Sequence, residues 1–210
     1  MWDPSRFVIV EDRGSVFVDE LYVAPCFKSA AGMREMGEFF AANYARRMAS
    51  GGILAPKKRS DGLLVVFQKR KKKGRRWENS DLCEDTVESL ATSRSLPVEV
   101  TRDEGHLSIS QVIALYEAVH VTVGPHGAGI ASAVFMRPGS AVIEFCHMGA
   151  DQYWRPDCRW FGDDLRAMGH RVISLLCKDC RHNGPMRVDH LEVAELVLHL
   201  AATLKVEQSQ

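Results

Sequence analysis

The stretch VGPHGAGIASAVFMRPGSAVIEF, residues 123–145, places a glycine-rich turn with a histidine between two apolar runs. The run VHVTV that leads into the turn and the run AVIEF near the end of the stretch have the length and residue types of buried strands. IASAVF, directly after the turn, has the apolar pattern of a helix. Residues 124–129 therefore connect a strand to a helix, and either their path is sterically tight or a ligand comes close to their backbone.

Strands and helices alternate along the rest of the chain as well. The sequence predicts strands at residues 62–67, 96–101, 120–123, 141–145 and 171–176. It predicts helices at 79–93, 110–118, 130–135, 157–168 and 188–205. Ser108-x-x-Gln111, before the second of these helices, has the pattern of a capping box. Such alternation is typical of right-handed βαβ crossovers, so we expect an α/β, Rossmann-like fold, a parallel sheet with helices on both faces.

The composition is that of an ordinary globular protein. The chain has 210 residues, of which 46% are hydrophobic, and its formal net charge is zero. A neutral chain gives no sign of a general affinity for nucleic acid or acidic membranes. We see no apolar run of 18 residues and no signal-peptide pattern, and we expect no membrane segment. Residues 57–210 are predicted to form the main domain, with a helix from residues 1–56 packed on it.

A basic segment follows the first predicted strand. Between Lys57 and Arg76 there are ten Lys or Arg residues and a single acid, Asp61. Its second half, KRKKKGRR, shares the carboxyl edge of the sheet with the glycine-rich turn if the strands are parallel. Arg70, and Arg75 or Arg76 before the next helix, are the residues that we expect to face a ligand there. A guanidinium suits a diphosphate because its planar fork can donate to two oxygens at once.

The turn has features of a phosphate site. A helix starting near Gly127 or Ala128 would present unpaired N–H groups and the positive end of its dipole. Gly127 and Gly129 lack the Cβ atoms that would hold a phosphate away, and His126 offers a hydrogen-bond donor at the same place. The alternative is a tight turn in which the glycines only solve a steric problem.

Two other functions fit parts of this pattern. A nicotinamide-dependent oxidoreductase would use Gly127, Gly129 and Glu144, but Ser132 stands where the dinucleotide fingerprint has its third glycine. A non-enzymatic RNA-binding protein would use the basic residues 69–76, which lack interleaved aromatic side chains. We expect neither a nicotinamide cofactor nor a nucleic-acid partner.

Six cysteines are too few and too scattered for a disulfide scaffold in a domain of this size. Cys177 and Cys180, with two histidines nearby, have the first half of a zinc-ligand spacing, but no second cysteine pair follows. We therefore expect a loop with two thiols and no metal site. In a secretory compartment these two cysteines could pair, and Cys146 with Cys158 is another option.

Taken together, these segments resemble glycosyltransferase family 61. The resemblance rests on LLVVFQKRKKKGRRWEN (63–79), LSISQVIALYEAVHVTVGPHGAG (107–129) and FMRPGSAVIEF (135–145). The HGAG turn, the F-x-x-P-G that follows it and the strand with its Glu come in the family's order and at its usual spacing. The similarity extends over residues 60–175, more than half of the chain.

The resemblance implies the GT-B architecture, in which two Rossmann-like domains face each other across a cleft. It also implies inverting transfer of a sugar from a UDP-sugar donor to a glycan or protein hydroxyl, with no further cofactor. On this basis residues 57–210 are the nucleotide-sugar-binding domain, and residues 1–56 include the end of the connection between domains. The amino-terminal domain would then be missing from this chain. The family implies the lumen of the Golgi or endoplasmic reticulum as the location.

The resemblance, together with the chemistry of the residues, assigns a donor site. The expected donor-binding residues are Arg70, Arg75, Arg76, Asn79, Gly127, Ala128, Gly129 and Glu144. The turn would bind the diphosphate through its backbone, the arginines would bind its oxygens, and Glu144 would take a ribose hydroxyl. His126 would be the catalytic donor that stabilises the leaving group. Asn79 fits a helix cap equally well, and the general base is not identified in these residues.

Overall fold

The computed structural model describes residues 62–69, 76–127, 129–147, 159–177 and 184–208. Within them, one sheet of parallel strands runs in the order β2-β1-β3-β4-β5. The strands are β1 (Leu63–Gln68), β2 (Val98–Asp103), β3 (Val121–Pro125), β4 (Ala141–His147) and β5 (Arg171–Cys177). The helices are α2 (Ser80–Ser93), α3 (Ile109–Ala118), α4 (Arg159–Ala167) and α5 (His190–Gln208), with the short 3-10 helix η2 (Ile130–Phe135).

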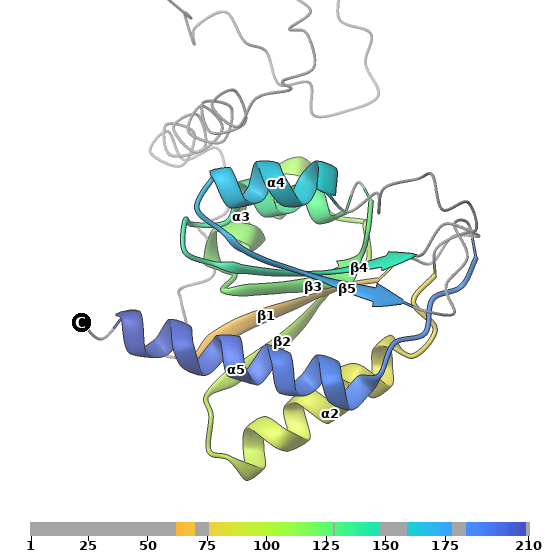
Figure 1. Cartoon of the computed structure of the whole chain (residues 1–210). Coiled ribbons are helices and arrows are strands. Elements are labelled where there is room, and N and C mark those ends of the chain that lie inside the picture. The colour runs from red at the N-terminus through yellow and green to blue at the C-terminus, as the bar shows by residue number, and fades with distance from the viewer. Residues whose placement is uncertain (1–61, 70–75, 128, 148–158, 178–183, 209–210) are drawn as a thin grey trace, which may run out of the picture.

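Helices cover both faces of the sheet (Figure 1). The helices α2 and α5 pack against each other on one face, and α3, η2 and α4 lie together on the other. The α/β, Rossmann-like fold expected from the sequence is therefore confirmed. The proposed division at residue 56 falls outside the described residues and stays a prediction.

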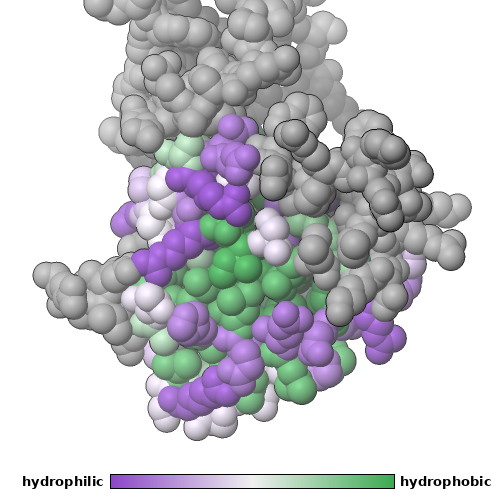
Figure 2. Space-filling model, in the orientation of Figure 1, coloured by the Kyte–Doolittle hydropathy of each residue, from purple (hydrophilic) through white to green (hydrophobic). Residues whose placement is uncertain are grey.

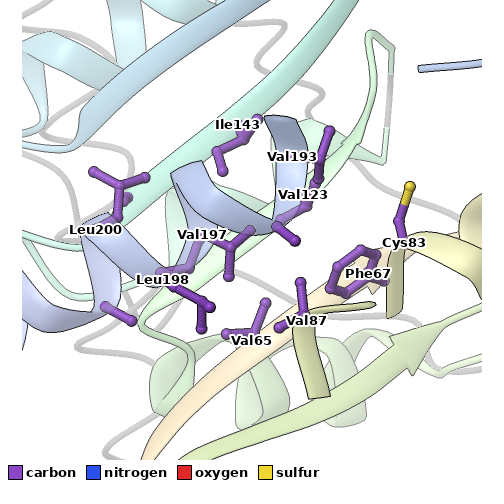
Figure 3. Packing of buried hydrophobic residues seen from close by; sticks show 14 of the residues in the cluster. Val65, Phe67, Cys83, Val87, Val123, Ile143, Val193, Val197, Leu198 and Leu200 are labelled. Carbon is purple, nitrogen blue, oxygen red and sulfur yellow. The ribbon is translucent and has the colours of Figure 1, made fainter. Parts of the chain in front are cut away.

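The strand β1 has apolar layers on both of its sides. All six of its residues are buried, as a continuous apolar run in a parallel sheet predicts. Val65 and Phe67 pack with Val87 of α2 and Val197 of α5 in the cluster drawn in Figure 3. Val66 lies in the second cluster, on the side of α3, η2 and α4. Two apolar cores, one on each face of the sheet, therefore hold β1 in place. Gln68, at the carboxyl end of the strand, is polar and is buried with it.

The edge strand β5 is less completely covered. Ile173 and Leu175 are only partly buried. Figure 2 shows hydrophobic residues gathered between polar bands on the face of the molecule where Figure 1 draws β5 in front.

Among the described residues, no helix is both long enough and apolar enough to cross a membrane.

Most of the predicted elements form close to their predicted positions, and the differences lie near the carboxyl edge. The capping box of Ser108 and Gln111 is present at the start of α3, as predicted. The strand β2 ends at Asp103, two residues later than the sequence pattern indicated. The helix after the glycine-rich turn is a 3-10 helix of six residues, and the sequence around it explains its length. Pro138 follows closely, and a residue that precedes proline disfavours helical backbone.

Candidate functional site

The strand order changes direction between β1 and β3, which are neighbours in the sheet. From β1 the chain passes to β2 on one side, and it then returns to β3 on the other side. In open parallel sheets, ligands bind beyond the carboxyl ends of the strands at such a switch point. Gln68 is the last residue of β1, and His126 directly follows β3. The glycine-rich turn therefore lies at the position in this fold where a ligand is expected.

An imidazole and a carboxylate are paired beside this turn. Nδ1 of His126 lies 2.5 Å from Oε1 of Glu144, and the two side chains are 10% and 0% exposed. The strand register explains the contact, because Pro125 pairs with Phe145 and the N–H of His126 donates to the carbonyl of Phe145 at 2.9 Å. A carboxylate only accepts hydrogen bonds, so Nδ1 carries the hydrogen. Nε2 is then the second position at which the ring can bind a ligand.

Glu144 lies inside β4, which continues to His147. The side chain of Glu144 has no exposed surface, and its Oε2 has no hydrogen-bond partner among the described residues. A buried carboxylate depends on the hydrogen bonds that it receives, and the bond within the described structure comes from His126. The expected contact of Glu144 with a ribose hydroxyl stays a prediction.

The structure gives the turn glycines steric reasons of their own. Gly127 has a φ of 141°, a backbone conformation that residues with side chains rarely adopt. A Cβ on Gly129 would lie 2.7 Å from Oε1 of Gln68, and a Cβ on Gly124 would lie 2.7 Å from Cβ of Gln68. The steric interpretation of the glycines therefore holds, whether or not a phosphate also approaches them.

The helix predicted at residues 130–135 is present over that range as a 3-10 helix, and its first turn is hydrogen-bonded back to Gly127. The N–H groups of Ile130 and Ser132 donate to the carbonyls of Gly127 and Gly129 at 2.9 and 3.0 Å. A short 3-10 helix has little of the dipole that the prediction relied on. No described residue accepts a hydrogen bond from the N–H of Gly127 or Gly129. Ala128 lies outside the described residues.

The arginines of the basic segment are described only at its end. Arg70 and Arg75 lie outside the described residues. Arg76 has a side chain that is 60% exposed, and its NH2 group lies 3.3 Å from Oε1 of Glu78. Its expected contact with a diphosphate stays a prediction.

Lys69, the first residue of KRKKKGRR, is held in an ion-pair network. Its ammonium lies 3.0 Å from Oε1 of Glu84 and also pairs with Asp81. Nε of Arg102 lies 2.5 Å from Oε2 of the same buried Glu84. Lys69, by its hydrogen bond and its charge, lowers the pKa of Asp81, with a smaller contribution from Arg102. This lysine therefore joins β1 to α2, and its charge is already paired within the protein.

Asn79 occupies the N-cap position of α2, but its side chain does not cap the helix. Its amide Nδ2 donates to the carbonyl of Val188 at 2.7 Å, and its Oδ1 accepts from the N–H of Val188 at 3.2 Å. The prediction of a side-chain cap was wrong, because the amide instead binds a strand-like backbone segment before α5. Its role in donor binding stays a prediction.

A second polar group lies at the switch point, and the sequence pattern did not predict it. Gln68 of β1, Asp103 of β2 and Tyr116 of α3 are all buried. Their side chains are hydrogen-bonded to one another and to the turn. One signal was available in the sequence, since Gln68 is a polar residue directly at the end of an apolar run.

The cysteines of the described residues differ in their oxidation state. Cys146 and Cys177 each take part in a disulfide bond. The expectation that Cys177 is a thiol was therefore wrong. Cys83 is a free, buried cysteine. Cys158 and Cys180 lie outside the described residues. Within the described ranges, no three His, Cys, Asp or Glu side chains are grouped so that they could hold a metal ion.

Comparison with known proteins found one family and one relative that the chain resembles. The pattern of the family described as Glycosyltransferase 61 matches residues 3–143, which is 141 of the 210 residues of the chain. The chain is also 27% identical over 86 residues to the xylan glycosyltransferase MUCI21 of Arabidopsis thaliana. That alignment covers 41% of this chain and 17% of the plant protein, so the chain matches only a small part of that relative's length.

Proposed function

The chain belongs to glycosyltransferase family 61, and from this we propose that it binds a UDP-sugar at the switch point between β1 and β3. In this proposal it is the donor-binding half of an inverting enzyme with GT-B architecture. The observation that carries the proposal is the buried pair of His126 and Glu144, placed directly after β3. In this pair, Glu144 holds the imidazole of His126 where the diphosphate of a nucleotide would lie.

The chemistry of the proposed reaction requires stabilisation of a leaving anion. The oxygen of an acceptor hydroxyl attacks the anomeric carbon, the bond from that carbon to the diphosphate oxygen breaks, and the electron pair stays on the diphosphate. Because the diphosphate gains negative charge, donors aimed at it lower the barrier. The hydroxyl proton passes to a general base that we do not assign in this chain.

His126 is the residue that we propose as the main donor. An imidazolium carries a hydrogen on each nitrogen, so it can donate from Nδ1 to Glu144 and from Nε2 to the diphosphate. The backbone N–H groups of Gly127 and Gly129 lie in the same turn and supply further donors. Arg70, Arg75 or Arg76 would complete the positive surroundings of the phosphates.

We propose a glycan hydroxyl as the acceptor class and the secretory pathway as the location. The relative in Arabidopsis thaliana is named for xylan, which is a polysaccharide. The disulfide-bonded state of Cys146 and Cys177 is in keeping with an oxidising compartment. The identity of the sugar and of the acceptor would follow from assays of the whole enzyme.

The two other functions are supported less well. A dinucleotide fingerprint would need a third glycine, and Ser132 stands in its place. An RNA-binding surface would need unpaired cations, and Lys69 is already paired with Asp81 and Glu84. Neither alternative explains the histidine in the turn.

Calorimetric titration of the chain with UDP, with NAD and with a short RNA tests the proposed function. We expect UDP to bind and NAD not to bind. Binding of NAD without UDP would contradict the proposal and favour a dinucleotide site. Binding of RNA alone, with an affinity that falls steeply as salt is added, would favour a polyanion-binding surface.

A further inference from the structure

The carbonyl of Gly129 is fixed by a side chain from the neighbouring strand. Nε2 of Gln68 donates to this carbonyl at 2.5 Å and to the hydroxyl oxygen of Tyr116 at 2.6 Å. Both hydrogens of the amide group are therefore used. Gln68 is 4% exposed, so water does not compete freely for these bonds.

The hydrogen bonds continue from Tyr116 of α3 to Asp103 of β2. The hydroxyl of Tyr116 donates to Oδ2 of Asp103 at 3.0 Å, and the N–H of Gly105 donates to Oδ1 of Asp103 at 2.8 Å. Burial, together with the charge of Asp103, raises the pKa of Tyr116, so the hydroxyl keeps the proton that it donates. The carboxyl ends of β1 and β2, the helix α3 and the turn after β3 are thereby joined in one chain of hydrogen bonds.

This chain fixes which way the amide of Gln68 faces. If the amide were rotated by half a turn, its oxygen would face the carbonyl oxygen of Gly129, and neither atom can donate. Oε1 of Gln68 instead occupies the space that a Cβ on Gly129 would fill, and Cβ of Gln68 occupies the space beside Gly124. Two of the turn glycines are thus matched in shape to one glutamine.

From these contacts we infer that Gln68 is a positioning residue, which holds His126, Gly127 and Gly129 in the conformation that binds the diphosphate. The inference rests on the proposed function, because it concerns the same site. Gln68 itself need not touch the ligand. It acts by fixing the carbonyl of Gly129, which lies in the same peptide plane as the N–H of Ile130. That N–H donates to the carbonyl of Gly127 at 2.9 Å, so Gly127, directly after His126, is held as well.

Two substitutions of Gln68 separate its hydrogen bonds from its volume. The Gln68→Met variant keeps a side chain of similar length and removes both donated bonds. We expect UDP to bind this variant about tenfold more weakly, as the loss of buried hydrogen bonds predicts. The Gln68→Glu variant places a carboxylate against the carbonyl of Gly129, and we expect a larger loss at neutral pH. Because a protonated carboxyl can donate again, the affinity of this variant relative to the unaltered chain should recover as the pH is lowered.

A control variant at the opposite edge of the sheet accounts for general loss of stability. The hydroxyl of Ser140 is buried and donates to the carbonyl of Val119 at 3.3 Å, at the amino ends of β3 and β4. The Ser140→Ala variant should lose stability and bind UDP as the unaltered chain does. UDP binding by the Gln68→Met variant with unchanged affinity would overturn the inference and leave the proposed function standing.

Amide hydrogen exchange tests the inference even if UDP does not bind. In the Gln68→Met variant, we expect the amides of Ile130 and Ser132 to exchange at least about tenfold faster, since their acceptors lie in the turn. The amides of Val142 and Ile143 in β4 should keep their rates. Faster exchange confined to the turn, in a chain that does not bind UDP, would contradict the proposed function and support the role of Gln68 in holding the turn. Unchanged exchange in the turn would overturn that role.

Discussion

Nδ1 of His126 lies 2.5 Å from Oε1 of Glu144, and the carboxylate that holds the ring has no exposed surface. Glu144 lies in β4, and His126 directly follows the adjacent parallel strand β3, in which Gly124 pairs with Glu144. The ring is 10% exposed, so only a small part of it is left for a ligand to reach. This arrangement fixes the orientation of the imidazole ring at the switch point through Nδ1.

The Gly129→Ala variant tests the close packing of the turn against Gln68. A Cβ at residue 129 would lie 2.7 Å from Oε1 of Gln68, and we expect the variant to lower the free energy of unfolding by about 1–3 kcal/mol. In a Gln68→Ala background the same change should cost much less, because the clashing oxygen is gone. Denaturant unfolding of the single and double variants measures both effects.

Gly124→Ala is the matched control for this pair. Its Cβ would lie 2.7 Å from Cβ of Gln68, an atom that the Gln68→Ala change keeps. Its cost should therefore persist in the Gln68→Ala background. Equal relief of both glycine substitutions would contradict the proposed packing.

The stability of the domain should fall in mildly acidic solution because of His170. Burial lowers the pKa of His170 to about 4 from its usual 6.5, against a smaller opposing effect of the Ser140 backbone. Between these two pH values, the unfolded chain binds a proton at His170 and the folded protein does not. As the pH falls from 6.5 towards 4, the unfolded chain takes up this proton first and the free energy of unfolding decreases, by about 3 kcal/mol for this one group.

The His170→Leu variant isolates this effect from the titration of carboxylates. Denaturant unfolding at several pH values between 4 and 7 measures the slope of stability against pH for both chains. We expect a clearly smaller slope in the variant over this range. Equal slopes would show that His170 does not bind its proton differently in the folded and unfolded states.

The thiol of Cys83 should be unreactive in the folded protein. Cys83 is buried in the core of Figure 3, and burial, with the nearby charge of Glu84, raises its pKa to about 12. The thiolate is the nucleophilic form, so an alkylating reagent should leave this residue unmodified. Mass spectrometry after brief alkylation, with and without denaturant, checks this. Rapid modification without denaturant would mean that α2 opens readily from the sheet.

The fold could be predicted from the sequence because its elements have local causes. The apolar run of β1 and the Ser108–Gln111 capping box are each contained in a few consecutive residues, and both form as expected. The short 3-10 helix was not predicted, because the apolar pattern of IASAVF does not distinguish one turn type from another. The position of the glycine-rich turn at the carboxyl edge followed from the strand and helix pattern alone.

The contacts within the site depend on residues that are far apart in the sequence. Gln68 and Tyr116 are 48 residues apart, and Asn79 and Val188 are 109 residues apart. Local patterns carry no information on such partners. The sequence pattern predicted that β2 ends at Thr101, so it did not place Asp103 at the carboxyl end of the strand. The sequence thus predicted where the candidate site lies, and the pairing of its side chains required the structure.

The most direct test of the account is calorimetric titration with UDP of the chain and of three variants at the His126–Glu144 pair. His126→Asn keeps a nitrogen near the position of Nδ1 and removes Nε2, whereas His126→Gln places a donor near the position of Nε2. Glu144→Gln keeps the shape of the carboxylate and removes its charge.

The account predicts that UDP binds the unaltered chain. It also predicts that His126→Asn and Glu144→Gln each weaken binding by about tenfold or more, and that His126→Gln weakens it less than His126→Asn does. Thermal unfolding of the same variants shows whether each remains folded. UDP binding that all three folded variants retain unchanged, or no UDP binding by the unaltered chain, would contradict the central claim.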